Sequence, residues 1–331
     1  MTRQVATLVL LMLAAGCGGG DGGGAAITGP SAPSAAVTFS AAPMDPAAIQ
    51  FIVPLGNLNP PGHTLPTDHI YFYHHLNTGP FTPVPVIAPA SGTIAALINR
   101  GGDAKIYVRT DSTHQYYFDH VTLAAGLGVG SRVDAGSRIG DSASIGFDFS
   151  VLNTARSQSF ANPGRYSSDT LTADAPLTYF DEPVRSALYA RVQRIGGELD
   201  GRISYDVAGT LAGNWFADDL AVSESARGDD PTVGMRQLAF VKDTRIADRL
   251  RISIGGFGML GVYGVPAETA DFSTVTPASG VVTYRLLSPE GTDQQGLLIV
   301  QMVDTTHIRV EAFRGGGTSA SFSAAARIYL R

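Results

Sequence analysis

The chain has little cysteine, little charge and no surplus of basic residues. Its single cysteine, Cys17, excludes an internal disulfide framework and a zinc site built from several thiolates. Charged residues make up only 16% of the 331 residues, which argues against a coiled coil or a charged disordered tail. With 23 Lys and Arg against 29 Asp and Glu, the formal net charge is −6. Because binding to phosphate backbones needs a basic surface, we expect no nucleic-acid partner.

Apolar residues, glycine and proline are plentiful by contrast. Apolar residues make up 44% of the chain, which is enough for a hydrophobic core, and the length indicates about two domains. The 39 glycines and 19 prolines favour many turns. The composition therefore predicts a mainly β fold.

The N-terminus accounts for the lone cysteine. Arg3 precedes an apolar run, residues 5–13, that is too short to span a bilayer stably, and small residues lead directly into Cys17. This pattern resembles the lipobox of bacterial lipoproteins. The resemblance implies that residues 1–16 are a signal peptide and that lipid on Cys17 anchors the protein to a membrane. The alternative is a plain secretory signal in which the cysteine is incidental.

The resemblance to lipoproteins also predicts the cellular location of the protein. Gly18, rather than an acidic residue, follows the cysteine, which favours the periplasmic side of the outer membrane if the host has one. Residues 17–45 are dominated by Gly, Ser, Pro and Ala, so we expect a flexible tether there. After it we expect a first folded domain over residues 46–180.

Short apolar segments separated by glycine and proline run through that first domain, which is typical of a β-sandwich or barrel. Residues 88–94 read Ala-Pro-Ala-Ser-Gly-Thr-Ile, and residues 129–140 follow the pattern V-G-x-x-V-x-x-G-x-x-I-G. Both segments resemble elements of the LytM/lysostaphin-type zinc endopeptidases, and the resemblance covers about a third of the chain. It implies a LytM-like β-sandwich domain and a link to peptidoglycan.

The resemblance also implies a zinc site. In that family a His, an Asp in the pattern H-x-x-x-D and the second His of an H-x-H strand bind zinc, while further histidines assist catalysis. His63 matches the first ligand and Asp68 the second, although the spacing is one residue longer and His69 is a rival for that place. His120, which follows Tyr117-Phe118-Asp119, takes a catalytic place. A zinc ion with three protein ligands activates water at its open position.

The H-x-H position departs from the family pattern. Residues 145–151 read Ile-Gly-Phe-Asp-Phe-Ser-Val, and side chains alternate across a strand. We therefore expect Ile145, Phe147, Phe149 and Val151 to face the core, and Gly146, Asp148 and Ser150 to face the site. Asp148 could bind a metal through oxygen, whereas Gly146 offers no side chain. The candidate zinc ligands are thus His63, Asp68 and Asp148, an anionic set that holds zinc less selectively than two histidines and one aspartate.

The rest of the chain predicts a helix and a second β domain. Apolar residues at helical spacing follow Asp181, and Gly196-Gly197 end the pattern, so we expect a connecting helix over residues 181–196 that packs where the domains meet. About seven strand-like segments over residues 197–331 favour an antiparallel β-barrel or sandwich. Gly213-Asn214-Trp215, with Arg327 near the end, faintly resembles a lipocalin-type closure, in which an arginine packs on the tryptophan.

Three hypotheses for function follow. The leading one is a lipid-anchored cell-envelope protein whose LytM-like domain has lost or weakened its peptidase activity and binds peptidoglycan or an envelope partner. The second is an active zinc metalloendopeptidase that cleaves peptidoglycan peptides. The third is a carrier that holds a small apolar ligand in the C-terminal barrel.

Overall fold

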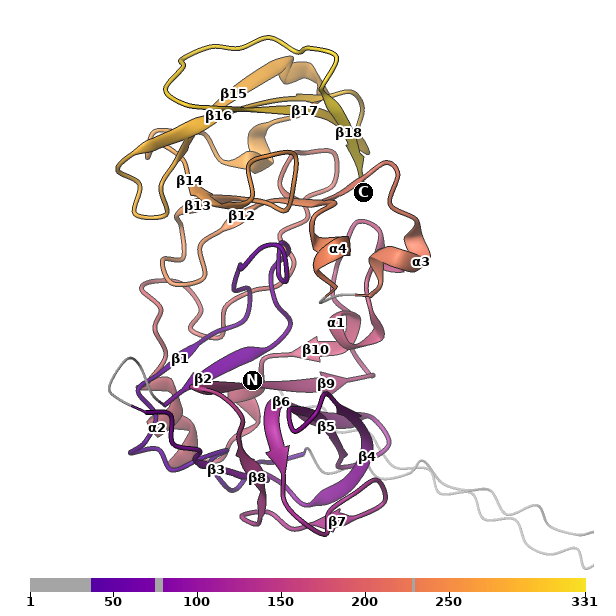
Figure 1. Ribbon diagram of the computed structural model, residues 1–331, viewed down its shortest axis with the longest axis vertical. Coiled ribbons are helices and arrows are strands. Elements are labelled where there is room, and N and C mark those ends of the chain that lie inside the picture. Colours follow the sequence, from indigo (N-terminus) through magenta and orange to yellow (C-terminus); the bar gives the residue numbers. More distant parts are fainter. Residues whose placement is uncertain (1–36, 75–79, 228–229) are drawn as a thin grey trace, which may run out of the picture. The chain divides into compact units, whose positions relative to one another are not determined.

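The computed structural model describes residues 37–74, 80–227 and 230–331 (Figure 1). The predicted signal peptide, Cys17 and most of the predicted tether lie outside the described residues. Within the described ranges, no helix has the length and apolar character needed to cross a membrane. The structure is mainly β, as the sequence predicts, and consists of a ten-stranded sheet followed by a closed eight-stranded barrel.

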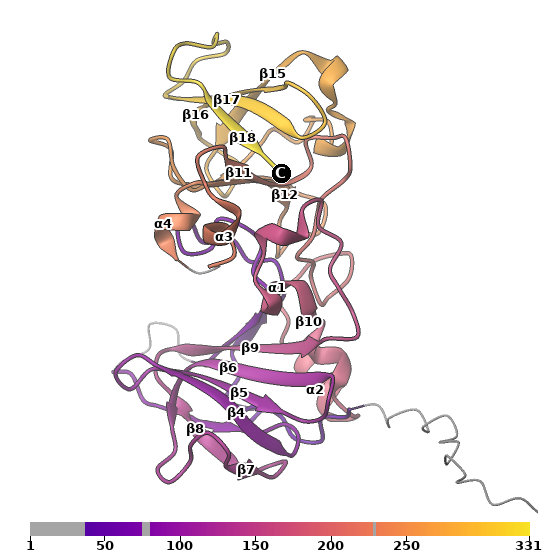
Figure 2. The same ribbon diagram turned by 90° about the vertical axis from the view of Figure 1, so that its right-hand side faces the viewer.

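The first sheet is antiparallel and is assembled around its longest strands (Figure 2). Its strands are β1 (Phe51–Val53), β2 (Ile70–Tyr73), β3 (Pro85–Ile87), β4 (Gly92–Asn99), β5 (Ala104–Arg109), β6 (His114–Leu123), β7 (Arg132–Val133), β8 (Arg138–Ser142), β9 (Gly146–Asn153) and β10 (Ala173–Asp174). Along the main path the order is β1-β2-β9-β6-β5-β4-β7. Strand β8 pairs with β3 and β6, and β10 pairs with β9, so β9 and β6 lie at the centre.

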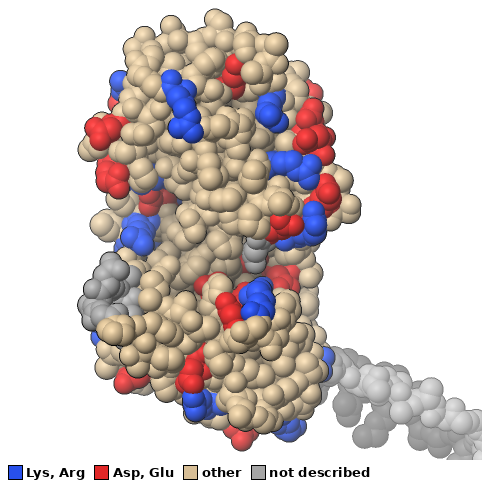
Figure 3. Space-filling model, in the orientation of Figure 1, with Lys and Arg blue, Asp and Glu red and all other residues tan. Residues whose placement is uncertain are grey.

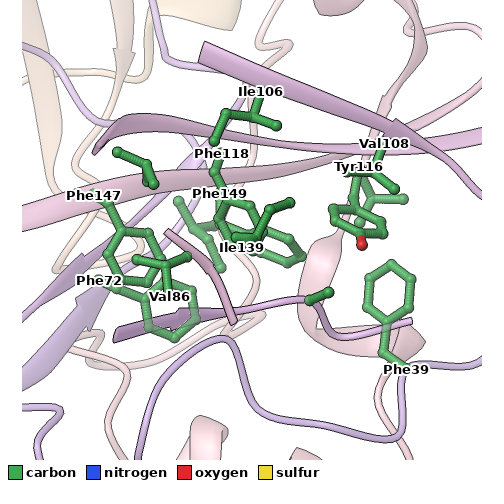
Figure 4. Packing of buried hydrophobic residues seen from close by; sticks show 14 of the residues in the cluster. Phe39, Phe72, Val86, Ile106, Val108, Tyr116, Phe118, Ile139, Phe147 and Phe149 are labelled. Carbon is green, nitrogen blue, oxygen red and sulfur yellow. The ribbon is translucent and has the colours of Figure 1, made fainter. Parts of the chain in front are cut away.

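The core of this part lies on one face of β9, as the alternation in its sequence predicts. Phe147 and Phe149 are buried there (Figure 4), and Val151 is buried as well. Ile145, which the alternation also places in the core, is 44% exposed, because it precedes the first residue of β9. Phe118 of β6 and Phe72 of β2 pack against them, with ring centroids 5.1 Å apart for Phe118–Phe149 and 5.3 Å apart for Phe72–Phe147. The intervening residues of β9 face the opposite side of the sheet.

Strand β6 changes partner part-way along its length. Residues 114–119 pair with β9, whereas residues 121–123 pair with β8. His120 lies at the change, with a φ of +62°. The register between β5 and β6 shifts at the same point. Such a bulge re-aims a side chain, and here it places the His120 side chain outside the regular alternation.

Two segments differ from the sequence prediction. The last part of the predicted tether, residues 37–45, belongs to the folded unit, because Phe39 is buried against Tyr116 and Phe180, with ring centroids 5.6 and 5.1 Å away. The connecting helix predicted over residues 181–196 is shorter and occupies only α2 (Val184–Tyr189). Its buried residue Leu188 joins the core of the first sheet rather than a boundary between domains.

The barrel contains the strands that follow this helix. They are β11 (Gly213–Ala217), β12 (Gln237–Lys242), β13 (Leu250–Ile254), β14 (Gly261–Gly264), β15 (Val281–Leu287), β16 (Gln294–Met302), β17 (His307–Arg314) and β18 (Arg327–Leu330). Each strand pairs with its neighbour in sequence, and β18 closes onto β11. Every second residue points inward, and large side chains such as Trp215, Phe240 and Tyr284 form one buried cluster. Because these side chains occupy the interior, we do not retain the apolar-carrier hypothesis.

An arginine packs on the barrel tryptophan, but it is not the predicted one. The guanidinium carbon of Arg331 lies 3.8 Å from the Trp215 ring centroid, whereas Arg327 is exposed. Arg331 also donates from Nη2 to the carbonyl oxygens of Thr210 and Ala212, at 2.8 and 3.1 Å. The resemblance to a lipocalin-type closure thus holds for the type of contact and fails for the residue. Arg327 is the first residue of β18 and is exposed there, whereas Arg331 follows the strand and is buried.

The remaining helical segments are short and lie in the connections. They are η1 (Pro163–Arg165), α1 (Ser168–Thr172), η2 (Pro176–Tyr179), α3 (Val222–Ser225), α4 (Pro231–Gly234), η3 (Phe272–Thr274) and η4 (Pro277–Ser279). Several of them contact the loop that carries His63. Thr64 Oγ1 donates to the carbonyl of Gly234 at 2.8 Å, and a Cβ atom on Gly234 would lie 1.7 Å from the Pro61 carbonyl oxygen. Close backbone packing therefore holds this loop in place.

Candidate functional site

A groove on the polar face of the first sheet brings together most of the residues that the sequence singles out. It encloses about 260 Å³, and His63, His120, Gly146 and Asp148 all line it. Its other lining residues are Asn57, Asn59, Tyr71, Tyr73, Ser144, Ile145 and Phe147. The prediction that Gly146 lies near the two histidines is confirmed.

Asp148 is the central charged group of this groove. It stands on β9 between Tyr71 of β2 and Asp119 of β6, and only 6% of its surface is exposed. Its Oδ2 lies 3.4 Å from Nε2 of His69 and 3.8 Å from Nε2 of His120. A carboxylate buried this deeply needs compensating partners, and two imidazoles from different parts of the chain provide them.

Asp68 lies behind His69 and does not line the groove. The Nδ1 atom of His69 donates to Asp68 Oδ1 at 3.0 Å, while Tyr117 and Thr170 donate to the two carboxylate oxygens at 3.2 and 2.5 Å. Burial by itself raises the pKa of Asp68, but the hydrogen bond and charge of His69, together with Thr170, hold it well below its ordinary value. Asp68 is thus a charged group that orients a histidine.

His69 is the residue whose ring lies between the two carboxylates. Since Nδ1 donates to Asp68, Nε2 points to the other side, where it lies 3.0 Å from the hydroxyl of Tyr71 and 3.4 Å from Asp148 Oδ2. A carboxylate behind an imidazole fixes the ring orientation and raises its basicity. Of the two residues that the sequence left as rivals, His69 therefore lies next to Asp148, and Asp68 lies on the other side of the imidazole.

His63 sits at the edge of the groove, on a tight loop. The backbones of Asn59 and His63 exchange hydrogen bonds of 2.8 and 2.9 Å. Its ring centroid lies 5.2 Å from that of His69, in an edge-to-face arrangement. The structure therefore brings His63 next to His69.

His120 lies on the opposite wall and is held by acidic neighbours. Its Nδ1 lies 2.8 Å from Asp103 Oδ2, and 44% of its side chain is exposed. Burial by itself lowers the pKa of His120, but the charges of Asp148, Asp119 and Asp103 and the hydrogen bond to Asp103 raise it above the ordinary value. Asp119 in turn accepts two hydrogen bonds from Arg100, at 2.7 and 3.2 Å. The imidazole is poised to carry a positive charge at the rim of the groove.

The position of the missing histidine is closed to any side chain. A Cβ atom on Gly146 would lie 2.5 Å from the carbonyl oxygen of Phe72 and 3.2 Å from Cδ1 of Tyr73. Gly146 pairs with Tyr73 in the register of β2 and β9. The phenol ring of Tyr73 thus occupies the space beside Gly146, and an imidazole there would require the neighbouring strand to move.

Tyr73 is the residue that the sequence reasoning missed. Counting the spacing H-x-x-x-D from His69 instead of His63 leads to Tyr73, where the family pattern has its aspartate. The spacing from His69 could therefore have indicated Tyr73, but choosing His63 as the first ligand concealed it. Tyr73 also stacks on Phe51, with ring centroids 4.8 Å apart, so it is held by packing.

The three residues that the sequence offers as zinc ligands do not all line the groove. His63 and Asp148 line it and Asp68 does not, and among the residues that the structure describes these three do not form a group whose donor atoms all lie within 4.8 Å of one another. Within the described ranges, the one group of three residues whose donor atoms lie within 4.8 Å of one another is Asp103, Asp119 and His120. Such a group could hold a metal ion, although Arg100 already occupies both oxygens of Asp119.

The face of the molecule in Figure 3 has no large area of one charge sign. Basic and acidic side chains lie there in small mixed groups, and most of the visible surface belongs to other residues. This distribution agrees with the small net charge of −6.

Comparisons with known proteins give partial structural matches. No protein-family model and no curated protein matches the chain. A zinc-containing peptidase from Vibrio cholerae is 17% identical with a TM-score of 0.29, over 35% of this chain and 37% of its own. A chain of the SpoIIQ–SpoIIIAH pore-forming complex is 14% identical with a TM-score of 0.33, over 46% of this chain and 96% of its own. Lysostaphin is 18% identical with a TM-score of 0.25, over 80% of each chain.

Lysostaphin gives its name to the peptidase type whose elements residues 88–94 and 129–140 resemble. The chain spans 37% of the length of the Vibrio cholerae peptidase.

Proposed function

We propose that the protein is a cell-envelope protein whose groove binds peptidoglycan, with peptide hydrolysis lost or strongly weakened. The observation that carries the proposal is the closed position at Gly146, where Tyr73 and the Phe72 carbonyl leave no room for a side chain. Without a group there, the groove lacks one of the imidazoles that the resembled enzymes use to move protons and stabilise charge.

The groups that remain suit binding. Asp148 offers a buried carboxylate that can accept hydrogen bonds from the amide groups of a peptide. His120 offers a donor at the rim, and Tyr71 and Tyr73 form an aromatic wall with ring centroids 6.2 Å apart. Ligand sites usually combine a few polar groups with aromatic surfaces in this way.

The anchor is part of the same proposal. Lipid on Cys17 would hold the groove at the membrane surface next to the cell wall, with the residues up to 36 as a tether. Replacement of Cys17 by Ser is expected to abolish incorporation of labelled fatty acid into the protein in cells. Incorporation that continues in this variant would contradict the anchor.

A co-sedimentation experiment with purified peptidoglycan sacculi tests the binding proposal. The wild-type protein is expected to sediment with the sacculi, and Asp148→Asn is expected to bind about tenfold more weakly, because the substitution removes a charged hydrogen-bond acceptor. Asp134→Asn is the matched control, since Asp134 is exposed and lies outside the groove. Equal binding of the two variants, or no binding by the wild type, would overturn the proposal.

A second candidate function is zinc-dependent hydrolysis. The observation that favours it is the approach of His69 and His120 to the same carboxylate oxygen of Asp148. In this case purified protein would contain stoichiometric zinc, and Asp148→Asn would lose both the metal and the cleavage of muropeptides. Elemental analysis of the purified protein and of this variant separates the two candidates.

A further inference from the structure

A second, smaller cavity borders the groove, and a buried arginine lines it. The cavity encloses about 50 Å³, and its walls include Arg165, His63, His69 and Gln237. His63 also lines the groove, so the two hollows are neighbours that share this residue. A space of this size holds one or two water molecules or a small polar group.

Arg165 is buried without a countercharge. It ends the segment η1, and only 4% of its surface is exposed. Its guanidinium lies 4.9 Å from the Phe216 ring centroid, and Nη1 donates to the carbonyl oxygen of Leu220 at 3.1 Å. Nε is buried and makes no hydrogen bond, and among the described residues no carboxylate forms an ion pair with Arg165.

This arrangement is costly unless something else meets the charge. A buried charge is normally paired, because taking an ion out of water is unfavourable. Of the other buried arginines, Arg251 pairs with Asp243 at 2.5 Å, whereas Arg331 has no ion pair among the described residues and donates to four carbonyl oxygens, where Arg165 donates to one. Burial lowers the pKa of Arg165, and no carboxylate raises it again.

The one carboxylate on the cavity wall belongs to a different network. Asp68 lines the cavity, but its oxygens accept hydrogen bonds from His69, Tyr117 and Thr170. It therefore does not serve Arg165. Gln237 and Ser225 complete the wall with neutral polar groups.

We propose that this cavity is a subsite for the carboxylate group of a bound peptide, with Arg165 as its anchor. A guanidinium presents a planar fork that matches the two oxygens of a carboxylate. The shared wall at His63 lets a peptide chain lie in the groove while its terminal carboxylate enters the smaller cavity. The anion site follows from the residues of the cavity alone, whereas its assignment to a peptide end rests on the proposed function.

Calorimetric titration with a matched pair of ligands tests this inference. The probes are acetyl-D-alanyl-D-alanine with a free carboxylate and the same dipeptide as its carboxamide, which differ in the charged group. The wild type is expected to bind the carboxylate about tenfold or more tightly than the carboxamide, as a charged hydrogen bond implies. Equal affinity for the two probes would overturn the subsite without any variant being needed.

Two variants locate the effect. Arg165→Met keeps the stem that packs near Phe216 and removes the charge, so it is expected to bind both probes equally weakly. Arg156→Met makes the same change of charge at an arginine whose side chain is 69% exposed, and it is expected to keep the wild-type preference. A preference that survives in Arg165→Met would overturn the assignment, as would inorganic phosphate competing as strongly as the dipeptide.

The outcome can be separated from that of the proposed function. If sacculi fail to bind the wild type while the free dipeptide binds with the carboxylate preference, the proposed function fails and the anion site stands. If sacculi bind but the dipeptide and its carboxamide bind alike, the proposed function stands and the subsite fails.

Discussion

The first sheet and the barrel are both antiparallel β structures, but they differ in which side chains they bury on each face. The barrel closes around one apolar cluster that includes Trp215 and Phe240. The first sheet uses one face of β9 for its core and buries charged groups, Asp148 and His69 among them, on the other. The comparison teaches that stability can come from either region, whereas the chemistry for a ligand is concentrated on the polar face of the first sheet.

The largest expected effect is the loss of a barrel side chain. Phe240→Ala is expected to lower the free energy of unfolding by about 3–5 kcal/mol, because it leaves a cavity among well-packed rings. Urea denaturation measures the change. Val303→Ala, at a residue that is 57% exposed, should change stability by less than about 0.5 kcal/mol. A small effect of Phe240→Ala would break the contrast between a packed barrel and a polar groove.

The second prediction concerns the closed position in the groove. Gly146→Ala is expected to lower the free energy of unfolding by about 1–3 kcal/mol, because the added methyl group meets the Phe72 carbonyl oxygen at 2.5 Å. Gly128→Ala is the control, since no atom lies within 4 Å of a Cβ there and its backbone needs no positive φ. If Gly146→Ala folds with wild-type stability, the site has room for the imidazole that we consider excluded.

The third prediction compares two buried arginines, one in each setting. Arg331→Met is expected to lower the free energy of unfolding by about 1–3 kcal/mol, because it removes hydrogen bonds to four carbonyl groups and the contact with Trp215. Arg165→Met removes one such bond together with an unpaired charge, so its stability without ligand should equal or exceed that of the wild type. Thermal denaturation of both variants measures the two changes in stability. A larger loss of stability for Arg165→Met than for Arg331→Met would contradict the prediction.

The smallest expected effect is a dependence of stability on pH, which comes from His120 at the rim of the groove. His120 has a pKa above its ordinary value of 6.5, so its protonated form stabilises the fold. This contribution is fully present below the unfolded pKa and is lost as the pH rises through the folded pKa. An NMR titration of His120 should show the raised pKa, and Asp148→Asn should lower it. Asp134→Asn should leave it unchanged, and an equal shift in both variants would argue against a local interaction.

Much of the fold could be predicted from local patterns. The alternation in residues 145–151 placed Phe147 and Phe149 in the core, and both are there. The turn pattern and the strand-like segments after residue 197 predicted a second antiparallel β unit, and the barrel confirms it. Period-two alternation is a strong signal because one face of each strand is buried.

The predictions of the fold were wrong at two segments whose structure depends on contacts between residues far apart in the sequence. Phe39 lies in a segment whose composition predicts a tether, and only its contacts with Tyr116 and Phe180 show that it is folded. The helix after Asp181 is shorter than its apolar spacing predicts, since the chain leaves it to pair Val192 with Ile52. Neither contact has a signature in the local sequence.

The candidate site was predicted in part. The sequence brought His63, His120, Gly146 and Asp148 to one place, and all four line the groove. It could not decide between Asp68 and His69, because the two are adjacent and only the fold shows which side chain faces Asp148. Arg165 had no signal at all, since its importance lies in the absence of a countercharge, which is a property of the folded protein.

The central claim is that this groove binds peptidoglycan without cutting it efficiently. The most direct test is to incubate the purified protein with sacculi in the presence of added zinc and to analyse the released muropeptides by chromatography, beside lysostaphin-type enzyme as a positive control. We predict that the protein remains bound to the sacculi and that the muropeptide profile does not change. Release of cleaved peptides by the wild type, and its loss in Asp148→Asn, would contradict the account.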